Sequence, residues 1–188
     1  MELVGLSPDE IDLVDLYSCF PSAVQIAARE LGFSLDRPLT VTGGLTFGGG
    51  PLNNYVMHSI SRVVTLLRED RNKKGLITAN GGFLTKHSFG IYSAMPPIRD
   101  FQYENLQAEV DKMPTREMAA DYEGPATLES YTVMFKNDKP EIGHCACLTP
   151  EGKRTWANIT DISVLNLMQV EEFCGRKVFI DGNGMVSL

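Results

Sequence analysis

The sequence predicts an α/β domain followed by a small all-β domain with one helix, and three observations lead to this fold class. Residues 9 to about 95 alternate short apolar runs with segments of helical spacing, as in layered α/β domains. Residues 96–121 are polar and lie between prolines, which is typical of an interdomain connection. From residue 122 on, apolar side chains recur with a period of two. We therefore expect domains at 1–95 and 122–188, joined by a linker at 96–121.

The first domain is expected to begin with a helical turn, a strand and a helix. Ser7 and Glu10 have the spacing of a capping box, which predicts one turn of helix after Ser7. The apolar-rich run at 11–17 is typical of a buried strand. Residues 21–31 carry apolar side chains at helical spacing and are followed by a glycine, so we expect a helix there.

The rest of this domain predicts one more strand, one helix and a hairpin. The segment 38–44 is expected to be a strand that leads into a glycine-rich stretch. Residues 52–70 have apolar side chains three and four positions apart, which indicates a helix. The runs 75–82 and 88–94 predict two strands, with 83–87 as a short connection. The resulting order is βαβαββ.

The second domain is expected to be a five-stranded barrel with one helix. The linker contains a single candidate helical turn, at 106–110. Three meandering strands, a helix and a closing hairpin follow, which is the order of a small barrel that resembles the oligonucleotide/oligosaccharide-binding (OB) fold. The expected strands are 126–135, 141–149, 154–160, 177–180 and 185–188, and the expected helix is 163–173.

Composition narrows the classes of function. The chain has 188 residues and a formal net charge of -7, so it offers no basic field for nucleic acids or anionic membranes. No apolar run is long enough to cross a bilayer, and the first residues lack the pattern of a signal peptide, so we expect a cytoplasmic protein without membrane contact. Four unevenly spaced cysteines are expected to be reduced thiols. Small molecules or proteins are therefore the expected partners.

Two groups of residues suggest metal binding or catalysis, and both have a simpler interpretation. His144, Cys145 and Cys147 suggest a metal, but the cysteines alternate onto one strand face and His144 onto the other. We therefore expect no metal site. His58 lies on a predicted helix without an acidic partner, and Cys174 lies at the end of a predicted helix, so structural roles are expected for both.

The glycine-rich stretch "TVTGGLTFGGGP" at 40–51 first suggests a phosphate-binding loop before a helix. It has neither the Gly-Lys-Ser/Thr ending nor the G-x-G-x-x-G spacing of the nucleotide-binding motifs. A tight turn that needs positive φ angles and close backbone packing is the alternative interpretation.

Three segments carry a resemblance to a known family. "IDLVDLYSCFPSAVQIAARELGF" (11–33), "TVTGGLTFGGGPLNNY" (40–55) and "KGLITANGGFLTKHSFGIYS" (74–93), in this order and spacing, resemble the C-terminal half of the thiolase superfamily. The resemblance covers about residues 5 to 95. The predicted barrel resembles the additional C-terminal domain of thiolase-like type 1 proteins, which are often labelled acetyl-CoA acetyltransferases. It implies a partial thiolase C-terminal half, with a mixed sheet and helices.

The resemblance implies acyl-CoA as the substrate and no separate cofactor. Thiolases hold an acyl group on a cysteine nucleophile and deprotonate a second acyl-CoA to make or break a carbon–carbon bond. The nucleophile belongs to the N-terminal half of the family, and no residue of this chain matches it. The chain is therefore expected to be an acyltransferase of lipid metabolism when an N-terminal half completes it, and inactive alone.

The resemblance also assigns candidate site residues. The family's strand-to-helix motif, usually Asn-Glu-Ala-Phe or His-Asp-Cys-Phe, matches residues 17–20, so Tyr17 and Cys19 are candidate catalytic residues. The first position of this motif helps to form an oxyanion hole, and a tyrosine hydroxyl can still donate a hydrogen bond there. The family's Gly-His-Pro turn matches Gly49, Gly50 and Pro51, which are expected to contact substrate. Gly50 occupies the histidine position and has no proton to transfer.

The third matching segment contains the family's Cys-x-Gly motif. It matches Asn80, Gly81 and Gly82, with Asn80 at the position of the acid/base cysteine and the two glycines as substrate-binding residues. An asparagine donates hydrogen bonds but does not act as a general base. His87 follows this loop and is either a substitute base or a hairpin histidine that packs or faces solvent.

Three functions therefore follow from the sequence. The first is the C-terminal portion of a thiolase-like acyltransferase. This chain begins near the second strand of the thiolase half, and the resemblance places the absent first strand at the centre of the sheet, so a partner chain or a second copy is expected to cover the exposed edge. The second is a non-catalytic binding or scaffold protein. The third, nucleic-acid binding by the barrel, is disfavoured because residues 122–188 carry six Lys/Arg against nine Asp/Glu.

Overall fold

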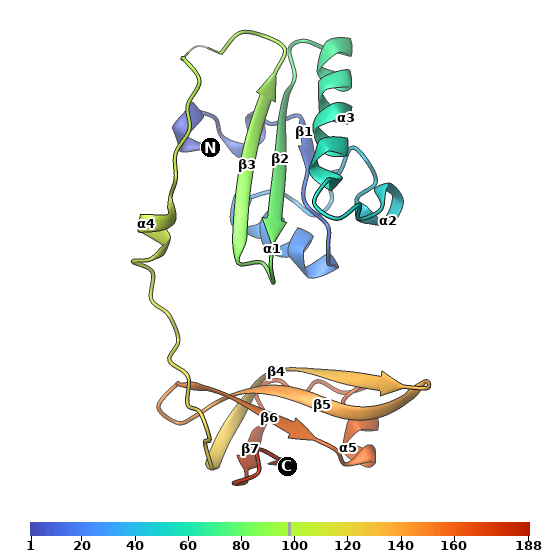
Figure 1. Cartoon of the computed structure of the whole chain (residues 1–188), viewed down its shortest axis with the longest axis vertical. Coiled ribbons are helices and arrows are strands. Elements are labelled where there is room, and N and C mark those ends of the chain that lie inside the picture. Colours follow the sequence, from blue (N-terminus) through green and yellow to red (C-terminus); the bar gives the residue numbers. More distant parts are fainter. Residues whose placement is uncertain (98) are drawn as a thin grey trace. The chain divides into compact units, whose positions relative to one another are not determined.

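The computed structural model describes residues 1–97 and 99–188, which separate into two compact units, Met1–Asn105 and Leu106–Leu188. Figure 1 shows one sheet in each unit. The first sheet has the strand order β1-β2-β3, and the second has the order β6-β5-β4-β7-β8. The predicted α/β part, followed by a β-rich part with a helix, is confirmed. Among the described residues, no helix combines the length and the apolar character that a membrane crossing needs.

The first unit is a mixed three-stranded sheet with helices. Strand β1 is parallel to β2, and β2 is antiparallel to β3. The capping box between Ser7 and Glu10 is present and precedes a single turn of 3-10 helix. The elements are η1 (Glu2–Val4), η2 (Pro8–Glu10), β1 (Leu13–Asp15), α1 (Pro21–Leu31), α2 (Leu45–Gly48), α3 (Tyr55–Glu69), β2 (Lys74–Gly81) and β3 (Lys86–Ser93).

The two long helices of this unit cover opposite faces of the sheet. Successive residues of a strand point to opposite faces, and Leu76 and Ile77 of β2 belong to different clusters of buried side chains. Leu76 packs in the cluster that includes Ala28 of α1, whereas Ile77 packs in the cluster that includes Val63 of α3. Helix α3 lies so close to β2 that a Cβ on Gly75 would be 2.6 Å from Val63 Cγ1.

The segment 38–44, which was expected to be a strand, forms none, so this prediction is wrong. One backbone hydrogen bond links it to the end of β1, from Leu16 N to Leu39 O at 2.9 Å. Immediately after this bond, the carboxylate of Asp15 accepts the backbone N–H groups of residues 41–42. The Asp15 side chain therefore takes the backbone N–H groups that a neighbouring strand would otherwise bind, and no strand pairing continues after Leu39.

The sheet has no gap at its centre, because β2 is its middle strand and pairs on both sides. Within the described part of the chain, the unpaired backbone of this sheet lies along its edge strands, β1 and β3. The first four residues of β3 are exposed, and Phe89 keeps 57% of its surface accessible. The described sheet therefore shows no gap where a central strand would be absent, and the expected partner chain or second copy stays a prediction.

The second unit is a five-stranded antiparallel sheet with one short helix in its core. Asp161 caps this helix by accepting the N–H groups of Ser163 and Val164. The helix was expected to reach residue 173 but ends at 167, because the side-chain amide of Gln169 donates to Leu165 O at 3.1 Å, where a continued helix would place a backbone N–H. The elements are α4 (Gln107–Val110), β4 (Gly124–Lys136), β5 (Lys139–Leu148), β6 (Arg154–Ile159), α5 (Ile162–Leu167), β7 (Lys177–Ile180) and β8 (Val186–Ser187).

The edges of this second sheet meet at one point. An isolated bridge joins Asn158 on β6 to Met185 beside β8, and Asn158 N donates to Gly184 O at 2.8 Å. One bridge is not a ladder, so the sheet is not a closed barrel in the described structure. The OB-like barrel stays a prediction, whereas its strands and their order along the chain are present.

Two of the four cysteines are buried in the core of the second unit. Cys145 and Cys147 are fully buried with Phe173, and His144 on the other face contacts Asn158 Oδ1 at 2.7 Å. Burial raises the pKa of Cys145 to about 12 and that of Cys147 to about 11. The thiolate is the reactive form of cysteine. These two thiols are therefore expected to react slowly, because they are buried and because they stay protonated.

Cysteine labelling tests this arrangement. We expect iodoacetamide at about pH 8 to modify Cys19 and Cys174 in the folded protein and to leave Cys145 and Cys147 unmodified, because only the first two reach solvent. Mass spectrometry of tryptic peptides measures the modified fraction at each site. Unfolding in urea is the control, since all four thiols should then react. Equal labelling in the folded state would contradict the buried positions.

Candidate functional site

A buried carboxylate organises the loops that the sequence assigns to the site. Asp15, at the end of β1, has no exposed surface. Its Oδ2 accepts from the Thr40 and Thr42 hydroxyls at 2.8 and 3.0 Å, besides the two backbone N–H groups described above. Its Oδ1 accepts from the Tyr55 hydroxyl at 2.9 Å and from the Ser59 hydroxyl at 2.6 Å. The group thus joins β1, the start of the glycine-rich stretch and α3.

No local pattern in the sequence predicted this network. An aspartate inside an apolar run was a signal, because a buried carboxylate requires hydrogen-bond donors. The donors lie 25 to 44 residues away in the sequence, and only folding brings them together. Tyr55, which is 1% exposed, has a raised pKa, mainly because of burial and also because of the Asp15 charge, so it stays a neutral donor.

The glycine-rich stretch is a backbone turn around the short helix α2. Gly44 precedes this helix with φ of 77°, and Gly49 follows it with φ of 70°. The Ser18 hydroxyl accepts from Leu45 N at 3.0 Å, and a Cβ on Gly44 would lie 2.6 Å from Ser18 Oγ. The interpretation as a tight turn with positive φ angles is therefore confirmed at these positions.

The turn after β1 also contacts the end of β2. The thiol of Cys19 donates to Asn80 Oδ1 at 3.4 Å, and Tyr17 N donates to Thr78 Oγ1 at 2.9 Å. The ring of Tyr17 packs edge-on against Tyr55, with centroids 5.5 Å apart. Two candidate residues that are 61 positions apart, Cys19 and Asn80, thus meet directly.

The hairpin after Asn80 carries the remaining candidates. Asn80 pairs with His87 in the β2–β3 ladder, and directly opposite residues of a ladder share a face. The His87 ring nitrogen Nε2 lies 2.8 Å from Leu84 O, so the ring is held within its own hairpin. Gly81 pairs with Lys86, and Gly82 opens the turn with φ of 61°.

The turn at Gly49, Gly50 and Pro51 is held through its own neighbours. Leu52 N donates to Gly50 O at 2.7 Å, and Asn54 N donates to Pro51 O at 3.0 Å. A Cβ built on Gly50 would meet Leu45 Cδ2 at 3.6 Å, an ordinary van der Waals distance. Since Gly50 also has no positive φ, neither its backbone conformation nor its surroundings require a glycine there.

Two comparisons with known proteins show what this chain is similar to. Residues 105–185 match the family model described as the thiolase-like protein type 1 additional C-terminal domain. The chain is also similar to the crystal structure of a monomeric SCP2-thiolase like protein type 1 from Mycobacterium smegmatis, with 35% sequence identity and a TM-score of 0.84. That match covers 94% of this chain and 40% of the other, so this chain spans two fifths of the length of its relative. No curated protein matches the chain.

Proposed function

This chain belongs to the thiolase-like proteins of type 1 over the length that it spans, and from this premise we propose that it forms the C-terminal side of an acyl-CoA site. The proposed substrate is an acyl-CoA, with no separate cofactor. The cysteine nucleophile of an acyl transfer would come from an N-terminal thiolase-like part, on a partner chain or elsewhere in the polypeptide. Acyltransferase activity is proposed for that combination and not for this chain alone.

One observation carries the proposal, namely the contact of Cys19 with Asn80 at the end of β2. It brings the strand-to-helix turn and the β2–β3 hairpin to one place, and Ser18 links the same turn to the glycine-rich stretch. The three segments that resemble thiolase loops are thus connected through residues 17–19. A site that receives a thioester needs such a convergence of loops.

The chemistry of these residues suits binding better than proton transfer. The Oδ1 atom of Asn80 accepts the Cys19 thiol, which leaves its NH₂ group to donate a hydrogen bond to a carbonyl oxygen. Asparagine is no general base, and Gly50 has no side chain. We therefore propose that this side of the site polarises a thioester carbonyl, while proton abstraction depends on a group from elsewhere.

Replacing Asn80 by alanine tests the role of the amide. We expect about a tenfold loss of affinity for acetyl-CoA, because one hydrogen bond to the thioester oxygen is lost. Isothermal titration calorimetry on the full chain measures this loss. The Asn72→Ala variant is the matched control, since Asn72 is exposed in the turn before β2, at the other end of the strand.

Two results would count against the proposal. If acetyl-CoA binds neither the wild-type chain nor its mixture with an N-terminal thiolase-like part, the chain has no acyl-CoA site. If Asn80→Ala and Asn72→Ala lower the affinity equally, the amide does not contact the thioester. A melting temperature within about 2 °C of the wild type would show that Asn80→Ala keeps the fold.

A second candidate function is acyl-CoA binding without turnover, as in a scaffold protein. This function is favoured because Gly50 and Asn80 stand where the family has its two acid/base residues. A thiolysis assay with an N-terminal thiolase-like part supplied separates the two functions. Turnover that disappears in His87→Ala would establish catalysis with His87 as the base, and binding without turnover would establish the scaffold role.

A further inference from the structure

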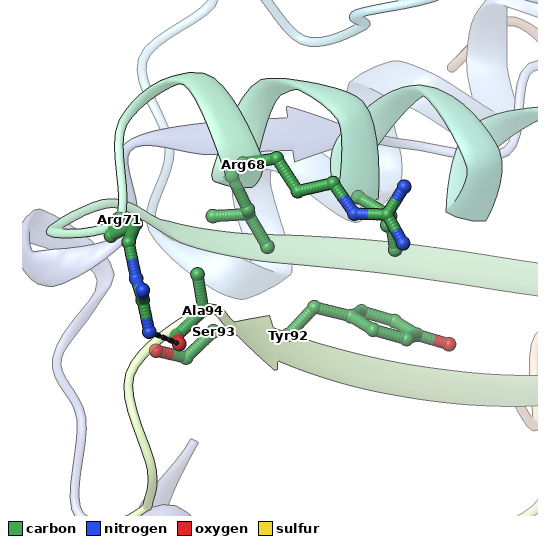
Figure 2. A pocket seen from close by; sticks show the side chains of 7 residues that line it. Arg68, Arg71, Tyr92, Ser93 and Ala94 are labelled. Carbon is green, nitrogen blue, oxygen red and sulfur yellow. Dashed lines mark hydrogen bonds between the residues drawn. The ribbon is translucent and has the colours of Figure 1, made fainter.

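A pocket of about 360 Å³ lies between the end of α3 and the end of β3, as Figure 2 shows. Its lining consists of Val64, Leu67, Arg68, Arg71, Tyr92, Ser93 and Ala94. Tyr92 pairs with Gly75 in the β2–β3 ladder, five positions before Asn80, so about 16 Å of strand separates the pocket from the candidate acyl-CoA site. The pocket is therefore a separate feature of the first unit.

All polar side chains that line this pocket can donate hydrogen bonds, and each is either cationic or neutral. Two are the guanidinium groups of Arg68 and Arg71, and two are the hydroxyls of Tyr92 and Ser93. No carboxylate lines the pocket within the described part of the chain. This lining favours an anionic group, although the chain as a whole has a net charge of -7.

The two arginines have hydrogen-bonding capacity left for a ligand. Arg71 Nη2 donates to Ala94 O at 3.4 Å, a long bond that occupies one of five N–H donors. Arg68 has an exposed side chain, and no described residue forms an ion pair with it. Two acidic residues, Glu69 and Asp70, lie between them in the sequence; Asp70 pairs with Lys73 at 3.5 Å, and neither of the two lines the pocket. In Figure 2, Arg71 reaches Ser93 and Ala94 at one end of the pocket, and Arg68 extends toward the Tyr92 ring at the other.

The surface between these cations is apolar. Val64 and Leu67 come from one face of α3, and Ala94 faces them from the end of β3. Leu67 is 3% exposed and belongs to the buried cluster under α3, so this wall is part of the rigid core. A ligand that fits the pocket thus needs an anionic group and a short apolar chain.

We propose that this pocket binds a small aliphatic carboxylate. The Arg71 guanidinium and the Ser93 hydroxyl hold the carboxylate at one end of the pocket, and the aliphatic chain lies on Val64 and Leu67 toward Arg68. The volume suits a ligand at the small end of those that protein pockets hold. This binding does not depend on the acyl-CoA site and is expected in the full chain as it stands.

Titration of the ¹⁵N-labelled full chain with hexanoate, followed by NMR, tests the proposal. We expect millimolar affinity, with shifts concentrated on amides of residues 64–71 and 92–94. Arg71→Ala should weaken binding about tenfold, because it removes the charged hydrogen-bond donor at the carboxylate end of the pocket. Arg62→Ala is the matched control, since Arg62 is exposed on α3 but does not line the pocket. Dispersed spectra of the variants show that they fold.

Titrations with hexanol and with inorganic phosphate test the contributions of the negative charge and of the aliphatic chain separately. The proposal predicts that hexanoate binds more tightly than either, since hexanol lacks the charge and phosphate lacks the chain. Hexanol that binds as well as hexanoate would overturn the role of Arg71, and phosphate that binds as well as hexanoate would overturn the role of the apolar wall. Absence of hexanoate-induced shifts at millimolar concentration, or equal weakening by Arg62→Ala and Arg71→Ala, would overturn the whole proposal.

Discussion

Replacing Asp15 by alanine is expected to destabilise the first unit by about 3 kcal/mol or more. The substitution leaves the buried Ser59 hydroxyl without its acceptor, removes the carboxylate partner of the buried Tyr55 hydroxyl, and frees the donors of residues 40–42. A buried donor that loses its partner retains its full desolvation cost. We expect the start of the glycine-rich stretch to detach from β1 as a consequence.

Hydrogen exchange followed by mass spectrometry measures this effect. Exchange in peptides that cover β2 should accelerate about 100-fold, which corresponds to the expected loss of free energy. Asp36→Ala is the control, because Asp36 is an exposed aspartate of the same unit and should change exchange little. Unchanged exchange in Asp15→Ala would show that the network does not hold the fold, and that the loops are positioned in another way.

Replacing Phe173 by alanine is expected to cost the second unit about 3–5 kcal/mol. The ring is fully buried in the main cluster of that unit, packs edge-on against Tyr131 with centroids 6.0 Å apart, and lies 3.8 Å below the Arg176 guanidinium carbon. Alanine leaves a cavity and removes both ring contacts. Little collapse is expected, because the cluster around the ring is built from several strands of the sheet and from α5.

The single tryptophan makes this effect measurable in one unit. Trp156 lies on β6, so its fluorescence during urea unfolding reports on the second unit. Phe135→Ala is the matched control, since Phe135 is on β4 of the same sheet but 52% exposed, and we expect it to cost less than about 1 kcal/mol. Similar urea midpoints for the two variants would contradict the position of Phe173 in the core.

The elements that local patterns describe well were predicted correctly. Helix α3 extends over Tyr55–Glu69 within the segment that apolar spacing indicated, and the hairpin of β2 and β3 lies where two apolar runs flank a short connection. The Ser7–Glu10 capping box also formed as predicted, because both partners lie within one helical turn. Such signals depend on neighbours along the chain, so no tertiary information is needed to identify them.

The error at 38–44 has a physical cause that no local pattern contains. Its alternating threonines and valine resemble a strand, yet the hydrogen bonds of this segment go to a carboxylate at position 15. The same holds for the end of α5, where one glutamine side chain takes a backbone carbonyl. In both places a polar side chain competes with the backbone, and the outcome depends on three-dimensional position.

In the candidate site, too, some features follow from the sequence and others require the tertiary structure. The residue types in the three loops, and with them the absence of a general base at Gly50 and Asn80, follow from the amino-acid sequence, because chemistry belongs to the side chain itself. The meeting of Cys19 with Asn80, and the central role of Asp15, depend on β1 and β2 lying side by side in the sheet. Contacts between residues that are tens of positions apart arise from packing of whole elements, and for this reason they emerged with the folded structure.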